Sequence, residues 1–370
     1  MIRKKDVFIN YVKNGGKSIC SPQIGAGAGF DTKLAGKKWI SETSVQDTLA
    51  AVEKFDMVPL INVGLCDLGI CNPELMWKES FFSREENKIY REKTLKTPVG
   101  MLQVKSVEVV YNSPLNVKYA LQGEDDLDAF EWYLDAAMES DFSKVTSYVC
   151  NIVRQVEGRA ALSVQWAMQP YEMLCFPNTV DTVLLAIDCP DRFMRLMDKI
   201  VKLDFKLIDA VARGGADFVF LGGPGSEMIS PAFYENYIVP YSKIVTAAAR
   251  DAGLLIYTHI CSPIEPMLSL GYYNQMGIDL FETLSSPPVG NIVSLEDALS
   301  KINPDICTRG NLGLDLLLNA NEKIVKQEAI RILEATNSRK HILAASDYLF
   351  YQISEKNIHA MCEAIKEYYS

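Results

Sequence analysis

The chain has 370 residues, of which 48% are hydrophobic and 23% are charged, and its formal net charge at pH 7 is −10. This composition favours a large buried core and excludes a mostly disordered chain. The acidic balance disfavours a nucleic-acid-binding protein, because phosphate binding requires clustered Lys and Arg. The N-terminal stretch is charged and then amphipathic, and no run of about 18 apolar residues occurs, so we expect neither export nor membrane insertion.

The nine cysteines are scattered along the chain without the dense spacing of a disulfide framework. Such spacing predicts reduced thiols in a cytoplasmic protein. Most of them, such as Cys150 and Cys175, stand in apolar runs, where free Cys behaves as a small core residue.

Short apolar runs alternate with longer segments of helical periodicity, the pattern of βα units around a parallel sheet. The expected strands are Ser18–Pro22, Val58–Val63, Ala161–Gln165, Phe218–Leu221, Leu254–Thr258, Ile278–Glu282, Asp305–Thr308 and Ile342–Ala345. The expected helices are Thr43–Glu53, Asp191–Arg213, Pro231–Asp251, Pro263–Met276, Asn321–Thr336 and Glu355–Tyr368, and Ser230-Pro231 and Ser262-Pro263 mark two helix starts. With a helical extension at 1–16 and an inserted β segment at 97–121, the pattern predicts an α/β fold: a single (β/α)8 TIM barrel domain over 1–370.

The expected fifth strand ends in His259-Ile260-Cys261. Residues two apart in an extended segment point the same way, so His259 and Cys261 both face the carboxyl end of the barrel, where barrel enzymes place catalytic groups. An imidazole beside a thiolate suits zinc. The alternative is a buried His bonded to a carbonyl beside a core Cys, and it stays open at this point. The other two histidines, His341 at a strand start and His359 on the last helix, indicate no chemistry.

Two carboxylates are expected at the same rim. Glu282 ends the next strand, and Asp347 follows the last one. We expect Glu282 and Asp347 to be further metal ligands or groups that handle a proton, although each taken alone reads as an ordinary loop carboxylate.

Other side chains border the expected barrel mouth. Gln165-Trp166 ends the third strand, Asn62 and Cys66 border the second, and Tyr257 precedes His259. These aromatic and amide groups suit a flat substrate, although Trp166 also fits plain packing under a loop. Gly223, in Gly222-Gly-Pro-Gly, allows a ligand to approach the backbone, or serves a tight turn.

The stretch 215–234, with Gly-Gly-Pro-Gly-Ser-Glu-Met-Ile-Ser-Pro, then His259-x-Cys261, Gly310-Asn311 and Asn357-Ile-His-Ala-Met, resembles the uroporphyrinogen decarboxylase superfamily over roughly 150–370. The resemblance implies a (β/α)8 barrel of one of two branches. One is a metal-free porphyrinogen decarboxylase, and the other comprises zinc-dependent methyltransferases that work with corrinoid proteins. The H-x-C pair belongs to the second branch.

Three further positions bear on the branch. Glu282 matches a Glu of the related cobalamin-independent methionine synthase barrel, one strand after its H-x-C. The 15–45 segment has no Arg, where the decarboxylase branch carries arginines that grip substrate carboxylates. Asp347 stands where many methyltransferases of the group have a Cys, and Cys307 is expected to be a core residue rather than its substitute.

The resulting hypothesis is a methyltransferase with Zn²⁺ on His259, Cys261, Glu282 and Asp347. A carboxylate in place of a thiolate leaves a harder Lewis acid, suited to polarising an ether oxygen. We therefore expect O-demethylation of a methoxylated, aromatic substrate, with methyl transfer to cob(I)alamin on a partner corrinoid protein. The alternatives are a methylcorrinoid:thiol methyltransferase, a decarboxylase, and a non-enzymatic corrinoid- or tetrapyrrole-binding module; a homodimer is left open.

Overall fold

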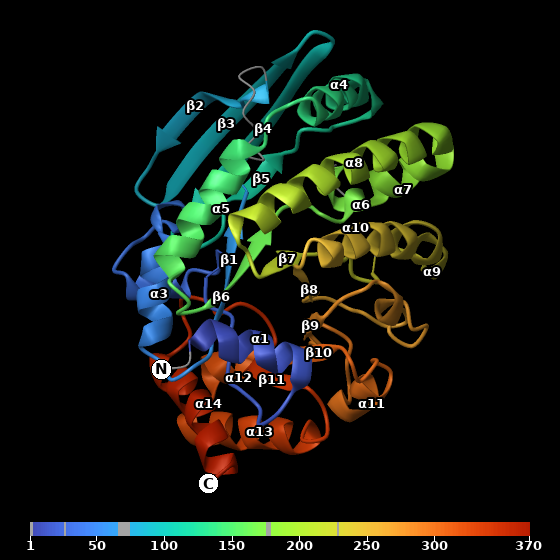
Figure 1. The fold of residues 1–370 in the computed structure, drawn as a ribbon. Coiled ribbons are helices and arrows are strands. Elements are labelled where there is room, and N and C mark those ends of the chain that lie inside the picture. The colour runs from blue at the N-terminus through green and yellow to red at the C-terminus, as the bar shows by residue number, and fades with distance from the viewer. Residues whose placement is uncertain (1–2, 26, 66–74, 175–178, 228) are drawn as a thin grey trace.

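The computed structural model describes residues 3–25, 27–65, 75–174, 179–227 and 229–370. Seven parallel strands form a curled sheet in the order β1-β6-β7-β8-β9-β10-β11 (Figure 1). They are β1 (Leu60–Gly64), β6 (Ala161–Gln165), β7 (Phe218–Phe220), β8 (Leu255–His259), β9 (Leu280–Thr283), β10 (Cys307–Leu312) and β11 (His341–Ala345). Consecutive strands pair in parallel with helices between them, which confirms the predicted α/β barrel class.

The eighth position of the barrel is occupied by the expected strand Ser18–Pro22. In the structure this segment forms only a single β-bridge, between Cys20 and Leu343. Ser21 N donates to Leu343 O on β11 at 2.9 Å, and Val58 N donates to Cys20 O at 2.9 Å just before β1. The segment therefore closes the sheet between its first and last strands.

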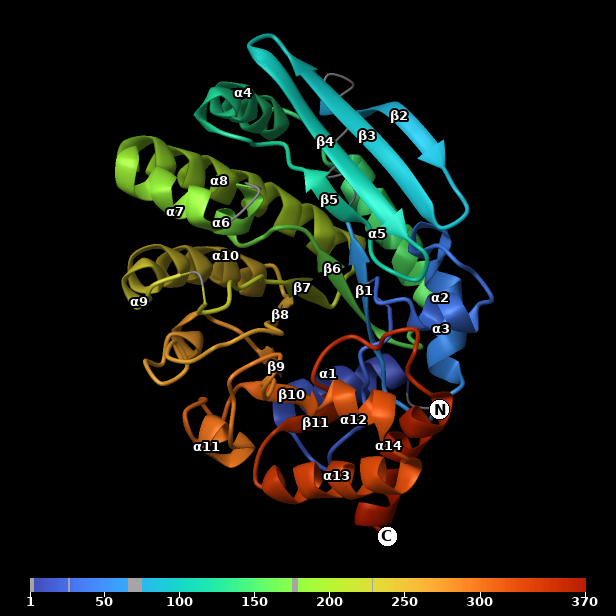
Figure 2. The same ribbon diagram turned by 180° about the vertical axis from the view of Figure 1, so that it is seen from behind.

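Helices surround the sheet on the outside (Figures 1 and 2). They are α2 (Phe30–Leu34), α3 (Val45–Glu53), α4 (Leu127–Met138), α5 (Ser143–Val156), α6 (Pro170–Met173), α7 (Thr179–Asp188), α8 (Pro190–Gly214), α9 (Pro231–Phe233), α10 (Val239–Asp251), α11 (Leu295–Ser300), α12 (Leu314–Asn319), α13 (Glu322–Ala335) and α14 (Glu355–Tyr368). Short 3₁₀ turns lie at Ile40–Glu42, Glu124–Asp126 and Tyr273–Gln275. None of the helices in the described ranges is long and apolar enough to cross a membrane.

The N-terminal helix α1 (Lys4–Asn14) covers the amino end of the barrel. Phe8, Tyr11 and Val12 form one buried cluster with residues of the strands, among them Phe218 and Cys307. Tyr11 also donates from its hydroxyl to His341 O at 2.8 Å. Because this end is filled by apolar side chains, the accessible end of the barrel is the carboxyl end.

The inserted β segment is larger than expected. Instead of 97–121, the antiparallel sheet comprises β2 (Lys78–Arg84), β3 (Lys88–Thr97), β4 (Gly100–Val109) and β5 (Leu115–Lys118). Its first two strands, β2 and β3, are mostly polar and charged and precede or only just reach the predicted segment. The sheet lies at one edge of the molecule, against α4 (Figure 2).

Two expected helices differ from the structure. Pro263–Met276 forms turns rather than an α-helix: Pro266 has no N–H to continue a helix, and Gly271 has a φ of +72°. Pro231–Asp251 is helical throughout, but a π-helical stretch, Tyr234–Ile238, interrupts it ahead of Pro240. The Ser230 side chain does accept from Phe233 N, as the Ser-Pro start predicts.

Candidate metal centre

Three neighbouring strands bring a basic, an acidic and a second basic side chain into one row. The parallel register pairs His259 on β8 with Glu282 on β9, and Glu282 with Arg309 on β10. Residues in register across adjacent strands have side chains on the same face, so all three meet inside the barrel near its carboxyl end. The strand register, rather than any local motif, therefore assembles this part of the site.

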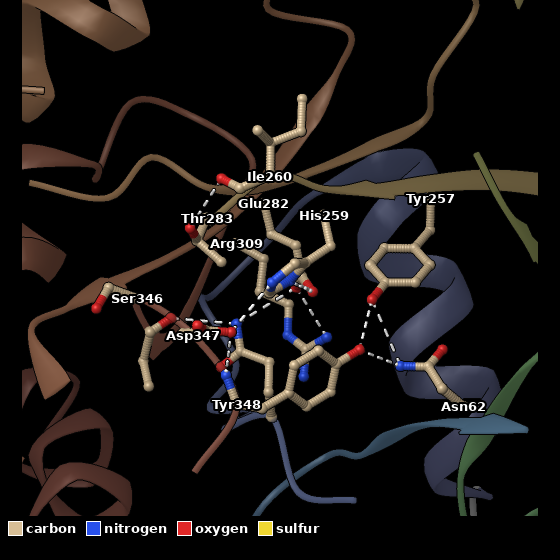
Figure 3. Close-up of polar contacts among 12 residues, drawn as sticks. Asn62, Tyr257, His259, Ile260, Glu282, Thr283, Arg309, Ser346, Asp347 and Tyr348 are labelled. Atoms are coloured by element: carbon tan, nitrogen blue, oxygen red, sulfur yellow. Dashed lines mark hydrogen bonds and ion pairs between the residues drawn. The ribbon is translucent and has the colours of Figure 1, made fainter. Parts of the chain in front are cut away.

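His259 has a carboxylate on each ring nitrogen (Figure 3). Its Nδ1 lies 2.9 Å from Glu282 Oε1, and its Nε2 lies 3.1 Å from Asp347 Oδ1. One donor atom each from His259, Cys261 and Asp347 lies within 4.8 Å of the others, a spacing that fits a metal ion. Glu282 is outside this group, because it occupies the opposite side of the imidazole.

The acids around His259 control its charge. Burial lowers the pKa of the imidazole, but hydrogen bonds with Asp347, Cys261 and Glu282 outweigh burial and hold the pKa well above its ordinary value. The position thus attracts positive charge, whether a proton on the imidazole or a cation beside it.

Glu282 is fully buried and is held from its other side by Arg309. Arg309 Nη1 lies 3.0 Å from Glu282 Oε2, and the Arg309 side chain is 1% exposed. Burial alone would raise the pKa of the Glu282 carboxyl. The charge of Arg309 and the hydrogen bond with His259 outweigh burial, so the pKa lies below its ordinary value. Arg309 is itself held by Ser21, because its Nε and Nη2 both donate to Ser21 O, at 2.9 and 2.7 Å. Gln23 Nε2 donates to Ala345 O at 3.1 Å and to Glu282 Oε2 at 3.4 Å. Glu282 is therefore fixed as an anion facing His259.

A pair of tyrosines lies beside the imidazole. The hydroxyls of Tyr257 and Tyr348 are 2.7 Å apart, and Asn62 Nδ2 donates to Tyr348 Oη at 2.7 Å (Figure 3). The ring centroid of Tyr348 is 5.0 Å from that of His259. Burial raises the pKa of both tyrosines, so both hydroxyls stay protonated. Asn62 and Tyr257, expected at the mouth from the sequence, thus do reach the site through Tyr348.

The remaining sequence-predicted substrate residues have other surroundings. Trp166 donates from Nε1 to Asp204 Oδ1 at 2.8 Å, so its indole is engaged by the outer helix α8 rather than by the site. Gln165 is half-buried at the end of β6, where its backbone O accepts from Leu65 N. Cys66 lies outside the described residues.

The backbone at Gly223 packs against another side chain and leaves no space for a ligand. A Cβ at Gly223 would lie 2.9 Å from Ile260 Cδ1, and a Cβ at Gly222 would lie 1.8 Å from Glu172 Oε2. Burial raises the pKa of Glu172 to about 7, opposed by a backbone hydrogen bond with Gly223. Close packing against Glu172 and Ile260 accounts for the lack of a side chain at these two positions.

The residues read as structural from the sequence are structural here. His341 is buried, with Nδ1 2.8 Å from Thr308 Oγ1 and Nε2 2.9 Å from Gly310 O. Cys307 is buried in the cluster under α1. His359 is exposed on α14.

Sequence reasoning missed Arg309, Tyr348 and Gln23. The sequence predicted that this strand ends at Thr308, whereas β10 continues to Leu312 and includes Arg309. Two-residue alternation from the core residue Cys307 would have placed Arg309 inside the barrel. Tyr348 directly follows Asp347 in the sequence, but only the structure shows that its ring turns toward His259.

Comparisons with known proteins agree with this architecture. The uroporphyrinogen decarboxylase (URO-D) family model matches residues 148–368. A uroporphyrinogen decarboxylase of Syntrophotalea carbinolica is 25% identical over 229 residues, covering 59% of this chain and 63% of that protein. One of Trichlorobacter lovleyi is 20% identical over 239 residues, covering 61% of this chain and 66% of that protein. The chain thus spans less than two thirds of the length of these relatives.

One solved structure matches along the whole chain. A methyltransferase from Methanosarcina mazei superposes with a TM-score of 0.68 at 14% sequence identity, covering 100% of both chains. At this identity the likeness shows a shared fold, which therefore includes the part of the chain before residue 148. Because the family model covers more than half of the chain, including β8 to β11 and α14, the protein belongs to the uroporphyrinogen decarboxylase family.

Proposed function

We propose that this protein is a zinc-dependent methyltransferase that moves a methyl group between a methoxylated aromatic substrate and the cobalt of a corrinoid protein. The observation that carries the proposal is the cluster of His259, Cys261 and Asp347 at the carboxyl end of the barrel. A decarboxylase without a metal has no evident use for a nitrogen, a sulfur and a carboxylate oxygen brought to one point.

The donor set fits zinc. Catalytic zinc sites use three protein ligands of the Cys, His and Asp/Glu types and keep the fourth position open, with bond lengths of about 2.0 to 2.3 Å. Ligand atoms within 4.8 Å of one another are compatible with such bonds. Zinc bound there supplies Lewis acidity toward an oxygen of the substrate.

The geometry favours a positioning role for Glu282 over the role of metal ligand that the sequence predicts. With Glu282 Oε1 accepting from His259 Nδ1, the imidazole is held with Nε2 toward Asp347 and available as a ligand atom. Metal-binding histidines are commonly oriented by a carboxylate on their second nitrogen. We therefore assign Glu282 to positioning His259, and Arg309 to holding Glu282.

Asp347 supports the proposed direction of methyl transfer, from the substrate to the cobalt. A carboxylate donates less charge to zinc than a thiolate, so the ligand set favours activation of an ether oxygen over activation of a thiol. Methyl transfer from a methylcorrinoid to a thiol uses the same geometry and is the second assignment. A non-enzymatic corrinoid-binding module has no need of stoichiometric zinc, so metal content separates that reading from both.

The test combines metal analysis with a methyl-transfer assay. Purified wild-type protein should hold about one zinc per chain, and with 1,2-dimethoxybenzene as donor it should methylate cob(I)alamin. His259→Ala and Cys261→Ala should lose the zinc and the activity while remaining folded. The matched controls are His359→Ala and Cys150→Ala, which change the same residue types outside the cluster. Full zinc occupancy in either site variant would disprove the metal assignment, and zinc without methyl transfer would disprove the reaction.

A further inference from the structure

A cavity of about 690 Å³ opens beside the candidate metal centre. Its floor includes Asp347 and Tyr348, which belong to the site already described. One wall is built by β4, β5 and the turn between them, and the opposite side by Gly27, Ala28 and Phe350. We propose that the inserted antiparallel sheet forms the substrate-selecting wall of the enzyme, and that this cavity takes an uncharged aromatic ring whose methoxy group reaches Asp347. The inference rests on the proposed function and adds the substrate class and the part of the chain that recognises it.

Alternate residues of β4 and β5 give the wall an apolar face. Val107 and Val109 are two apart on β4, and Leu115 and Val117 are two apart on β5, so each pair points to one face. The register places Val107 directly opposite Leu115. Leu115 and Val117 are 64% and 60% exposed, although side chains of this type gain from burial. Exposed apolar groups gathered around a cavity are typical of a binding surface.

Hydrogen bonds and close packing hold the wall against the barrel. The turn that joins β4 to β5 packs on the glycine-rich segment: Ser113 Oγ donates to Gly27 O at 2.6 Å, and Gly29, with a φ of +84°, passes under Tyr111. A Cβ at Gly29 would lie 2.3 Å from Tyr111 O. On the other side the ring of Tyr111 stacks on Tyr351 with centroids 4.8 Å apart. The apolar face is therefore held at a fixed place over Asp347.

The size and charge of the cavity define its occupant. Ligand pockets for small molecules range from about 300 to 1,000 Å³, and a cavity of about 690 Å³ accommodates a substituted ring. Among the described residues that line it, Asp347 is the single charged one, and no Lys or Arg is present to pair with an anion. With its methoxy group at Asp347, a bound ring would direct a carboxylate at its other end toward the apolar wall, whose described lining residues offer no cationic side chain. A neutral arene is therefore favoured over a carboxylated one, since a buried carboxylate needs a cationic partner.

The wall also stands apart from the family match. The residues of β4 and β5 precede residue 148, where that match begins, while Asp347 and Tyr348 lie within it. The reacting end of the cavity thus lies in the part of the chain that the family model matches, and the selecting wall lies in the part before it.

The test is direct binding of three probes to the zinc-loaded full-length protein, measured by calorimetry. The probes are 1,2-dimethoxybenzene, ethylbenzene, which has no methoxy group, and 3,4-dimethoxybenzoate, which is anionic. We expect both neutral probes to bind and the benzoate to bind more weakly by about tenfold or more, about 1.4 kcal/mol.

Two variants fill the cavity. Val107→Trp and Leu115→Trp should each weaken binding of both neutral probes by about tenfold or more, and the second lies on an exposed edge strand where a larger side chain is tolerated. The matched control is Met101→Trp, an exposed apolar residue on the same face of β4 about 20 Å away along the strand. It should bind the probes as the wild type does, and zinc content should be equal in all variants.

The outcomes separate this inference from the proposed function. If the Trp variants lose ethylbenzene binding but the wild type transfers no methyl group, the wall stands and the reaction is wrong. If the Trp variants bind and demethylate 1,2-dimethoxybenzene at wild-type levels, the wall assignment fails and the reaction stands. Equal binding of the benzoate overturns the charge argument. Unchanged affinity of both Trp variants for the neutral probes would show that the cavity does not take an aromatic ring and would overturn the inference.

Discussion

Asp347 is the residue at which the proposed chemistry is most directly tested. Its Oδ1 lies 3.1 Å from His259 Nε2 and also accepts from Tyr348 N at 2.7 Å, so the backbone holds the carboxylate at the Nε2 side of the imidazole. A side chain placed in this way serves either as a ligand or as a group that orients His259.

Replacement of Asp347 by Cys should keep zinc bound and slow demethylation of a methoxylated arene. A thiolate transfers more charge to zinc, which leaves less positive charge for the departing oxygen, and Lewis-acid stabilisation of this kind contributes several kcal/mol. Zinc affinity by chelator competition and the rate of cob(I)alamin methylation check both parts.

Asp347→Asn serves as the companion variant, because it retains hydrogen bonding and loses the anionic ligand. Zinc affinity should fall by about tenfold or more if Asp347 binds the metal. Unchanged affinity would place the carboxylate outside the metal shell, and wild-type rates in both variants would remove Asp347 from the reaction.

The buried pair of Arg309 and Glu282 predicts a second residue-scale result. Removing one partner of a buried ion pair leaves an uncompensated charge and costs about 3 to 5 kcal/mol. Arg309→Met should therefore lower the free energy of unfolding by an amount in that range, measured with urea. The double variant Arg309→Met with Glu282→Gln should recover part of the loss, because the two groups contact each other.

A second readout tests the positioning role. Glu282→Gln should weaken zinc binding by about 10- to 100-fold, the usual effect of losing an outer-shell partner of a metal-binding His. Additive stability effects in the double variant, or an unchanged zinc affinity in Glu282→Gln, would contradict the arrangement.

At the scale of the elements, buried polar contacts decide where strands end and how they are joined. β10 continues through Arg309 because Glu282 neutralises its charge, and β10 is tied to β11 by the imidazole of His341, which contacts Thr308 and Gly310. Neither contact follows from β-propensity, which disfavours a charged residue and a Gly within a strand.

His341 predicts a pH dependence of stability. Burial lowers its pKa from 6.5 to about 4, so the folded protein keeps the imidazole neutral where the unfolded chain already binds a proton. The folded-state pKa is the lower one, and stability from this residue is complete above pH 6.5 and is lost as the pH falls toward 4. One pKa unit corresponds to about 1.4 kcal/mol, so between neutral pH and pH 4.5 the loss should reach about 2 to 3 kcal/mol.

The measurement is urea unfolding at the two pH values for the wild type and for His341→Gln, which cannot titrate. The wild type should lose more stability than the variant on acidification by the amount given above, whatever the variant's stability at neutral pH. Parallel losses in the two proteins would show that His341 is not held neutral in the fold.

At the scale of the whole molecule, the site is enclosed by parts of the chain that lie far apart in sequence. The barrel strands supply the candidate metal centre, α1 fills the amino end, and the inserted sheet lines one side of the cavity at the carboxyl end. The part that the family model matches supplies the strands β8 to β11, and the part before it supplies the inserted sheet.

The lack of free arginines among the described residues near the site predicts that uroporphyrinogen is neither bound tightly nor decarboxylated, although the relatives named above are uroporphyrinogen decarboxylases. A tetrapyrrole with many carboxylates needs cationic partners, and the 15–45 segment has no Arg while Arg309 is buried against Glu282. Incubation of the purified enzyme with uroporphyrinogen should yield no coproporphyrinogen. Its formation would assign the protein to the decarboxylase branch instead.

The sequence by itself determined the βα alternation, the direction of the strands and the placement of His259, Cys261, Glu282 and Asp347 at strand ends, because these follow from local periodicity and from the geometry of parallel sheets. It also determined that Cys307 belongs to the core and that His341 begins a strand. The tertiary structure alone decided that Glu282 faces Nδ1 of His259, away from the candidate metal ligands, that Arg309 is buried inside the barrel, and that Trp166 is held by α8. It also decided that the polar strands β2 and β3 pair and carry β4 and β5 over the mouth. The physical reason is the same in each case: the free energy of a buried charge or of a polar strand depends on its partner, and that partner comes from a distant part of the chain.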